Sequence, residues 1–152
     1  MASSLNGSLS PCAGKCSTVF GDQVCRGCRR FSYEVIEWNR YSDEQKLLIW
    51  KRLDDQLDRI VLPLVPYANH PQVDAFLASR QVRLLDQSSQ GRHIYEALRI
   101  CQRTPELLLQ SGLNIMAADQ LKSIWQQVDA RIYTLAVANF EFTWLRAGTF
   151  GH

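Results

Sequence analysis

Four of the five cysteines lie close together near the N-terminus. They are Cys12, Cys16, Cys25 and Cys28, spaced as C-x3-C and C-x2-C with an eight-residue loop between the two pairs. Thiolates in such short pairs are the soft ligands that zinc and iron-sulfur clusters prefer. The spacing is typical of structural zinc sites and matches neither common ferredoxin pattern, so by itself it favours zinc over an iron-sulfur cluster.

Glycines and arginines surround these cysteines. Gly14 and Gly27 lie inside the pairs, where backbone N–H groups can turn toward sulfur if the chain adopts conformations that glycine tolerates. Arg26, Arg29 and Arg30 crowd the second pair. Four thiolates around zinc or a doubly charged cluster core carry a net charge of about −2, which these arginines would offset. Phosphate binding is the weaker alternative, because no broad basic face accompanies them.

Composition sets broad limits on the function. The chain has 152 residues, of which 46% are apolar and 21% charged, and its net charge of +2 does not favour nucleic acid or an anionic membrane as a partner. The N-terminus has no signal-peptide pattern, and the apolar stretch 132–138 is far shorter than the ~20 residues that span a bilayer. We therefore expect a cytoplasmic protein without a membrane segment, whose clustered thiols are metal ligands rather than disulfides.

Helical signals follow the cysteines. Phe31, Val35 and Trp38 recur at three- and four-residue steps and predict a short helix. A capping box at residues 42–45 then starts a helix predicted for 43–61. Its inner face is predicted to hold Trp50, Leu53, Leu57 and Ile60, and its solvent face Lys46, Lys51, Asp54, Asp55 and Asp58. Pro63 and Pro66 are predicted to end it, and we place a module boundary there.

The remaining chain predicts further helices. One begins at His70 and continues through Leu77, and Val82, Leu84 and Leu85 could extend it. Another covers 93–102, a short one covers 104–112, and a long one covers 117–147. The long helix carries a heptad seam, which we interpret as an interface within a bundle or with a partner. The candidate interface residues are Leu121, Trp125, Val128, Ile132, Leu135 and Phe142.

The cysteine stretch resembles a known family. The motif S-P-C-x3-C-x8-C-x-G-C-x-R closely resembles a short bacterial domain of unknown function commonly labelled a predicted Fe-S protein. The residues that carry the resemblance are Pro11, the four cysteines, Arg30, Glu34, Val35 and Trp38. It covers about residues 10–55 and departs at Phe31, where members often carry threonine. The resemblance implies an iron-sulfur or related metal centre without an established activity, so zinc and an iron-sulfur cluster become equal alternatives.

No other pattern predicts chemistry. Cys101 lies among apolar residues of a predicted helix, which indicates a buried free thiol rather than a nucleophile. His70 with Asp74 and His93 with Glu96 are pairs one helical turn apart, and neither has the third ligand that a zinc site needs. No P-loop, dinucleotide fingerprint, nucleophile elbow or H-E-x-x-H motif occurs, so an enzyme is not predicted.

These observations predict a mainly α protein, with a small four-cysteine metal knuckle followed by a helical bundle. We expect a tail at 1–10, a metal module at 11–62 and an α-helical domain at 63–152. The favoured function is a cytoplasmic, non-enzymatic metal-binding adaptor that binds a protein partner or forms a homodimer through its last helix. The alternatives are a small iron-sulfur redox or sensing protein and, more weakly, nucleic-acid binding through the arginines.

Overall fold

The protein is helical throughout the part of the chain that the structure, a computed structural model, describes, namely residues 9–12 and 16–150. No strand occurs in these residues, and the one β-bridge, Val24 with Phe31, is isolated. The prediction of a mainly α protein is therefore confirmed. The elements are η1 Ser17–Phe20, α2 Ser32–Glu37, η2 Trp38–Arg40, α3 Asp43–Leu64, α4 His70–Ser79, α5 Gln90–Arg103, η3 Pro105–Gln110 and α6 Ala118–Phe150.

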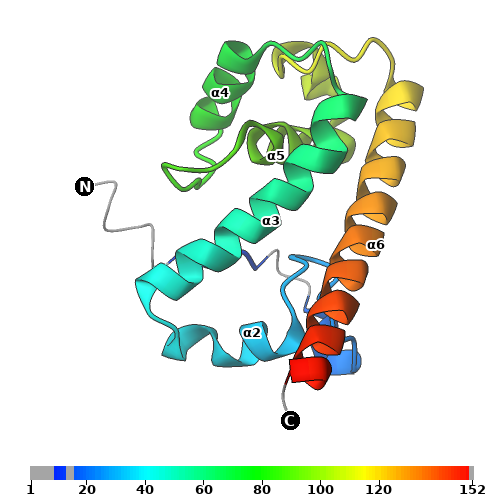
Figure 1. The fold of residues 1–152 in the computed structure, drawn as a ribbon. Helices are drawn as coiled ribbons and strands as arrows, with labels where there is room; N and C mark the ends of the chain where they lie inside the picture. Colours follow the sequence, from blue (N-terminus) through cyan, green and yellow to red (C-terminus); the bar gives the residue numbers. More distant parts are fainter. Residues whose placement is uncertain (1–8, 13–15, 151–152) are drawn as a thin grey trace.

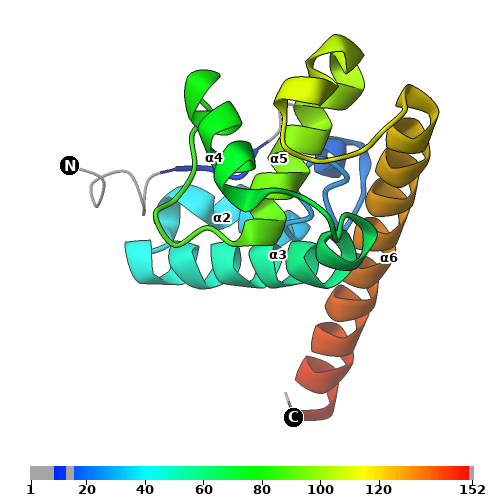
Figure 2. The same ribbon diagram turned by 90° about the horizontal axis from the view of Figure 1, so that it is seen from above.

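Helix α5 lies at the centre of the arrangement, since it packs against α3, α4, η3 and α6. The long helices α3 and α6 also pack against each other. Figure 1 shows α4 and α5 toward one end of the molecule and α2 toward the other, with α6 along one side, and Figure 2 shows the same helices from above. The cysteine segment lies at the α2 end, next to the C-terminal half of α6.

Side-chain hydrogen bonds cap the N-termini of three of these helices. The Ser42 hydroxyl accepts from the Gln45 backbone, and the Gln45 side chain accepts from the Ser42 backbone, so the predicted capping box is confirmed. The Asn69 side chain accepts from the backbone of Gln72 at the start of α4. Ser89 caps α5 in the same way. These caps satisfy backbone N–H groups that have no partner within their helix.

Helix α3 continues past its predicted end. We expected it to stop near residue 61 because of Pro63, but it ends at Leu64. A proline in the last turn costs one backbone hydrogen bond, since it has no N–H to donate. Val61 and Val65 are both buried in the main core on either side of it. Their burial explains why the helix continues for one more turn.

The main core joins residues from both sides of the predicted module boundary at 62/63. Leu57 and Val61 of α3 pack in the same cluster as Ile94 and Leu98 of α5 and Val128 of α6. The two-module division stays a prediction about domains. The packing itself is continuous across that point of the chain.

Two aspartates of α3 do not point to water as predicted. Asp54 is buried and accepts from Arg92 Nε at 2.8 Å. Asp58 is half-buried and accepts from the backbone N–H of Gly91 at 2.8 Å. A Cβ atom at Gly91 would lie 2.8 Å from the Asp58 backbone, so only glycine lets α5 approach α3 this closely. Both aspartates therefore fasten α5 to α3.

The other C-terminal elements differ from expectation in detail. Residues 105–110 form a 3-10 helix, and α4 ends at Ser79, so it does not include Val82, Leu84 and Leu85. His93 Nδ1 lies 2.8 Å from Asp74 Oδ1, so the histidine pairs with the carboxylate predicted for His70. The His93–Asp74 pair joins α5 to α4, which local spacing does not predict.

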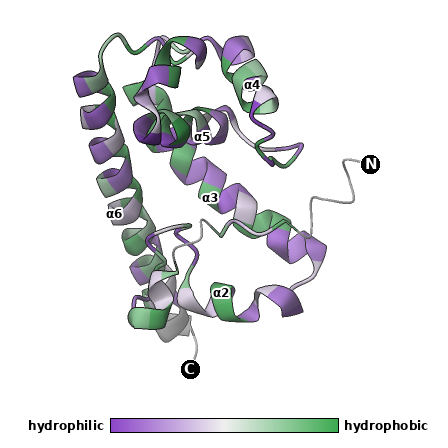
Figure 3. Cartoon of the chain, turned by 180° about the vertical axis from the view of Figure 1, so that it is seen from behind, coloured by the Kyte–Doolittle hydropathy of each residue, from purple (hydrophilic) through white to green (hydrophobic). Residues whose placement is uncertain are grey.

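Most residues of the predicted seam of α6 pack against other helices of the same chain. Leu121, Val128 and Ile132 are buried in the main core, Trp125 and Leu135 are half-buried, and Phe142 is 61% exposed. Hydrophilic and hydrophobic residues are interspersed along α6 (Figure 3). Among the described residues, no helix has the length and apolar character needed to cross a bilayer.

Candidate metal centre

A tight turn brings the second cysteine pair into the interior. Cys25 N donates to Arg30 O at 2.9 Å, Arg29 N donates to Cys25 O at 2.7 Å, and Ser32 N donates to Gln23 O at 2.8 Å. The side chains of Cys25 and Cys28 are both buried within this turn.

The turn has a residue in the left-handed backbone region, but this residue is not one of the glycines that we predicted. We expected Gly27 to adopt a conformation that glycine tolerates, but the left-handed residue is Arg29, with φ of 65°. Gly14 lies outside the described residues. Arg29 is held by its own side chain, because its Nη1 donates to Gly27 O at 2.7 Å and to the Tyr95 hydroxyl at 3.0 Å. Long-range packing therefore maintains the turn.

Backbone N–H groups favour the thiolate form of Cys25. Burial raises the pKa of this thiol, but hydrogen bonds from the backbone of Cys28, Ser17 and Gly27 outweigh it, so the pKa lies below its ordinary value. The Cys28 pKa is raised, because burial outweighs the hydrogen bond and positive charge of Arg30, whose Nε lies 3.2 Å from its sulfur. N–H groups directed at both sulfurs are what a negatively charged thiolate ligand requires.

The first cysteine pair is placed differently. Cys12 is exposed and Cys16 is half-buried, with the Cys16 sulfur 3.0 Å from the Thr18 hydroxyl. Within residues 9–12 and 16–150, no group of three or more His, Cys, Asp or Glu side chains is arranged to hold a metal ion. The donor chemistry of the buried pair fits a thiolate-bound metal, but the structure does not bring all four cysteines together. The four-cysteine site therefore stays a prediction.

Each of the three arginines stacks on an aromatic ring of a different element. The guanidinium of Arg26 lies 4.3 Å from the ring centre of Tyr133, that of Arg29 lies 4.9 Å from Tyr95, and that of Arg30 lies 4.9 Å from Trp38. Arg30 also donates to the Cys28 sulfur. Arg29 and Arg30 are buried, which leaves Arg26 as the exposed member. The arginines thus dock the cysteine segment onto α5, α6 and η2.

Glu34 links the motif to α3. It is buried, its Oε1 accepts from the Phe31 backbone at 2.8 Å, and Arg52 donates to both of its carboxylate oxygens at 2.6 Å. Val35 is half-buried, Trp38 is buried, and Pro11 lines a cavity beside Cys12. Sequence reasoning missed Arg52, Tyr95 and Tyr133 as partners of the motif. Their spacing gives no local signal, because each lies on a helix beyond the cysteine turn.

Cys101 is a buried free thiol, as predicted. Its side chain has no exposed surface, and burial raises its pKa despite a hydrogen bond from Ser111 and the positive charge of Arg80. A protonated thiol without solvent access is a poor nucleophile. Cys101 therefore has a packing role in the main core.

Residues 10–57 match a family described as "Protein of unknown function (DUF1289)". The match includes all four clustered cysteines and ends inside α3, so it covers less than half of the chain. No curated protein and no solved structure shows significant similarity to the chain. The comparisons therefore support a recognised segment and assign no activity to it.

Proposed function

We propose that this protein is a cytoplasmic metal-binding protein in which Cys12, Cys16, Cys25 and Cys28 hold zinc or an iron-sulfur cluster in a structural, non-enzymatic role. The observation that carries the proposal is the set of backbone N–H groups and the Arg30 Nε–H directed at the sulfurs of Cys25 and Cys28. These donors stabilise thiolates, and thiolates are the form that binds a soft metal. The exposed Cys12 and half-buried Cys16 would complete the set when the metal binds.

A structural role suits the donor set. Four thiolates around one metal leave no open coordination position for a substrate, unlike the three-ligand sites of catalytic zinc. The metal would stabilise the turn that presents Arg26, Arg29 and Arg30 to the aromatic rings of the helices. An iron-sulfur cluster in the same position would also allow redox sensing, which is the second candidate. Four sulfur ligands suit both, so metal content distinguishes them.

Metal analysis of anaerobically purified protein tests the proposal. One zinc per chain in a colourless sample supports the structural zinc site, whereas a brown sample with iron and acid-labile sulfide supports the cluster. Cys25→Ser should lose the metal on dialysis, because serine does not supply the soft ligand that its N–H groups are placed to stabilise. Cys101→Ala should keep it, since this cysteine lies in the main core. A wild-type chain purified without any metal, which takes up neither zinc nor iron, would refute the centre.

The adaptor role rests on the C-terminal end of α6. Phe142, Trp144 and Leu145 are each more than half exposed, and together they give this end an apolar character. We propose that this surface binds a second copy of the chain or another protein. Phe142→Asp should leave the far-ultraviolet circular dichroism unchanged and convert a dimer to a monomer in light scattering. A wild-type chain that is already monomeric would exclude the homodimer.

A further inference from the structure

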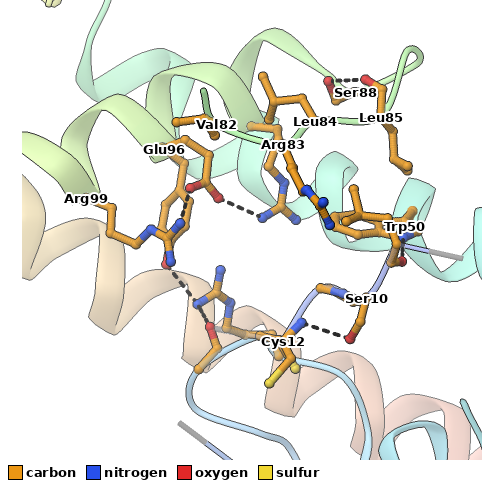
Figure 4. A pocket seen from close by; sticks show the side chains of 17 residues that line it. Ser10, Cys12, Trp50, Val82, Arg83, Leu84, Leu85, Ser88, Glu96 and Arg99 are labelled. Atoms are coloured by element: carbon orange, nitrogen blue, oxygen red, sulfur yellow. Dashed lines mark hydrogen bonds and ion pairs between the residues drawn. The ribbon is translucent and has the colours of Figure 1, made fainter. Parts of the chain in front are cut away.

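A cavity of about 320 Å³ lies between the cysteine segment and the helices. Ser10, Cys12 and Gly27 come to it from the N-terminal segment, and Trp50 comes from α3. Residues 82–85 and the α5 residues Arg92, Tyr95, Glu96 and Arg99 complete the wall. Figure 4 shows Trp50, Leu85, Glu96, Arg99 and Cys12 surrounding an open space. This volume is at the lower end of the range for small-molecule sites.

The lining of the cavity is strongly basic. Arg29, Arg83, Arg92 and Arg99 all line it, and Glu96 is the one carboxylate that does so. Glu96 accepts from Arg99 and lies 3.7 Å from Arg92 Nη1. Together with Asp54, which pairs with Arg92 from the α3 side, Glu96 offsets two of the four guanidinium charges and leaves two positive charges in excess. Because low-dielectric walls strengthen such charges, the cavity attracts anions.

Arg92 and Arg29 are the two buried members of this group, and Arg92 has 6% of its surface exposed. Its Nε donates to Asp54 at 2.8 Å, which fixes the guanidinium from the α3 side. Its Nη2 is buried without a hydrogen-bond acceptor in the described part of the chain. An unpaired donor on a buried cation costs free energy, which an acceptor in the adjoining cavity would recover.

The rest of the wall suits a small organic molecule. The Tyr95 hydroxyl accepts from Arg29 Nη1 and still has its own proton to donate. Trp50, Leu84 and Leu85 give one side an apolar surface. Guanidinium groups bind carboxylate and phosphate oxygens in pairs, and an apolar wall accommodates a hydrocarbon or ring attached to them.

We infer that this cavity binds a small organic oxyanion, whose carboxylate or phosphate group contacts Arg92, Arg83 and Arg99 and whose apolar part lies against Trp50. This site goes beyond the metal centre, because these four residues lie outside the cysteine segment. The thiols of Cys12 and Cys28 also line the cavity, and the proposed metal centre uses both as ligands. The site therefore serves binding.

Titration calorimetry of the full chain with four probes tests the site. Phenyl phosphate and benzoate share a ring and differ in their oxyanion, so their relative affinity distinguishes a phosphate site from a carboxylate site. Inorganic phosphate lacks the ring, and benzyl alcohol lacks the charge. We expect one of the two ring-bearing anions to bind at one site per chain, and both inorganic phosphate and benzyl alcohol to bind at least tenfold more weakly. Equal binding of benzyl alcohol, or no binding of either ring-bearing anion, would overturn the inference.

Two variants of cavity arginines and one control variant test the residues. Arg83→Gln removes an exposed cation from the cavity wall, and Arg131→Gln makes the same change of charge on the exposed face of α6. We expect Arg83→Gln to weaken binding by about tenfold or more and Arg131→Gln to leave it unchanged. Arg92→Lys keeps the charge but loses the paired donors, and it should also weaken binding if its circular dichroism shows a folded chain. Equal weakening by Arg83→Gln and Arg131→Gln would mean non-specific attraction and would refute the site.

Discussion

Val128→Asp is expected to unfold the protein at room temperature. Val128 has no exposed surface and packs in the main core, where α6 meets α3 and α5. An aspartate there is buried without a partner or becomes protonated, and either costs roughly 4–5 kcal/mol, close to the whole stability of many small domains. Urea titration followed by circular dichroism measures the loss.

Ala138→Asp is the matched control for this variant. It adds the same charge to the same helix at an exposed position, so we expect a change within about 0.5 kcal/mol. Equal urea midpoints for the two variants would show that the face of α6 at Val128 is not part of a core. A folded Val128→Asp chain of half the wild-type mass would instead assign this face to a dimer interface.

Glu34→Ala is expected to destabilise the protein by roughly 3–5 kcal/mol, because it leaves Arg52 without its ion-pair partner. The carboxylate is buried and accepts two hydrogen bonds from Arg52 and one from the Phe31 backbone. The Arg52 guanidinium also lies 4.1 Å from the ring centre of Phe31, so it would remain over an apolar surface with its charge unpaired. Thermal unfolding followed by circular dichroism measures the effect.

A double-mutant cycle with Arg52→Ala separates the ion pair from the helix start. If the pair is the main contribution, the double variant should be less destabilised than the sum of the two single variants, by roughly 1–3 kcal/mol. Lys51→Ala is the control, since Lys51 pairs with Asp55 on the exposed face of α3 and should change stability by less than about 1 kcal/mol. Strict additivity of Glu34→Ala and Arg52→Ala would show that the two side chains do not act together.

Local sequence was sufficient to predict where helices begin. The Ser42 capping box and the periodic apolar residues of α3 depend on neighbours within one or two turns, and both are confirmed. The end of α3 was predicted wrongly because burial of Val65 outweighs the local effect of Pro63. Asp54 was predicted wrongly for a related reason, since its partner Arg92 is 38 residues away.

The candidate site was predictable only in part. The cysteine spacing identified the residues at which backbone N–H groups approach sulfur. The spacing could not identify Tyr95 and Tyr133, because these rings lie on helices far along the chain. Arg29 stacks on Tyr95 and Arg26 stacks on Tyr133. The basic cavity is also invisible in the sequence, because its wall joins residues 9–12, 27–29 and 82–99 that only the packing brings together.

The stacking of Arg26 and Arg29 has a consequence for the segment that matches a known family. A fragment that stopped at residue 57 would be cut inside α3 and would lose both Tyr95 and Tyr133. It would also lose Phe140, whose ring lies 5.1 Å from that of Phe31. In this protein the helices beyond residue 57 thus serve as a scaffold for the cysteine segment, whose conformation belongs to the whole chain.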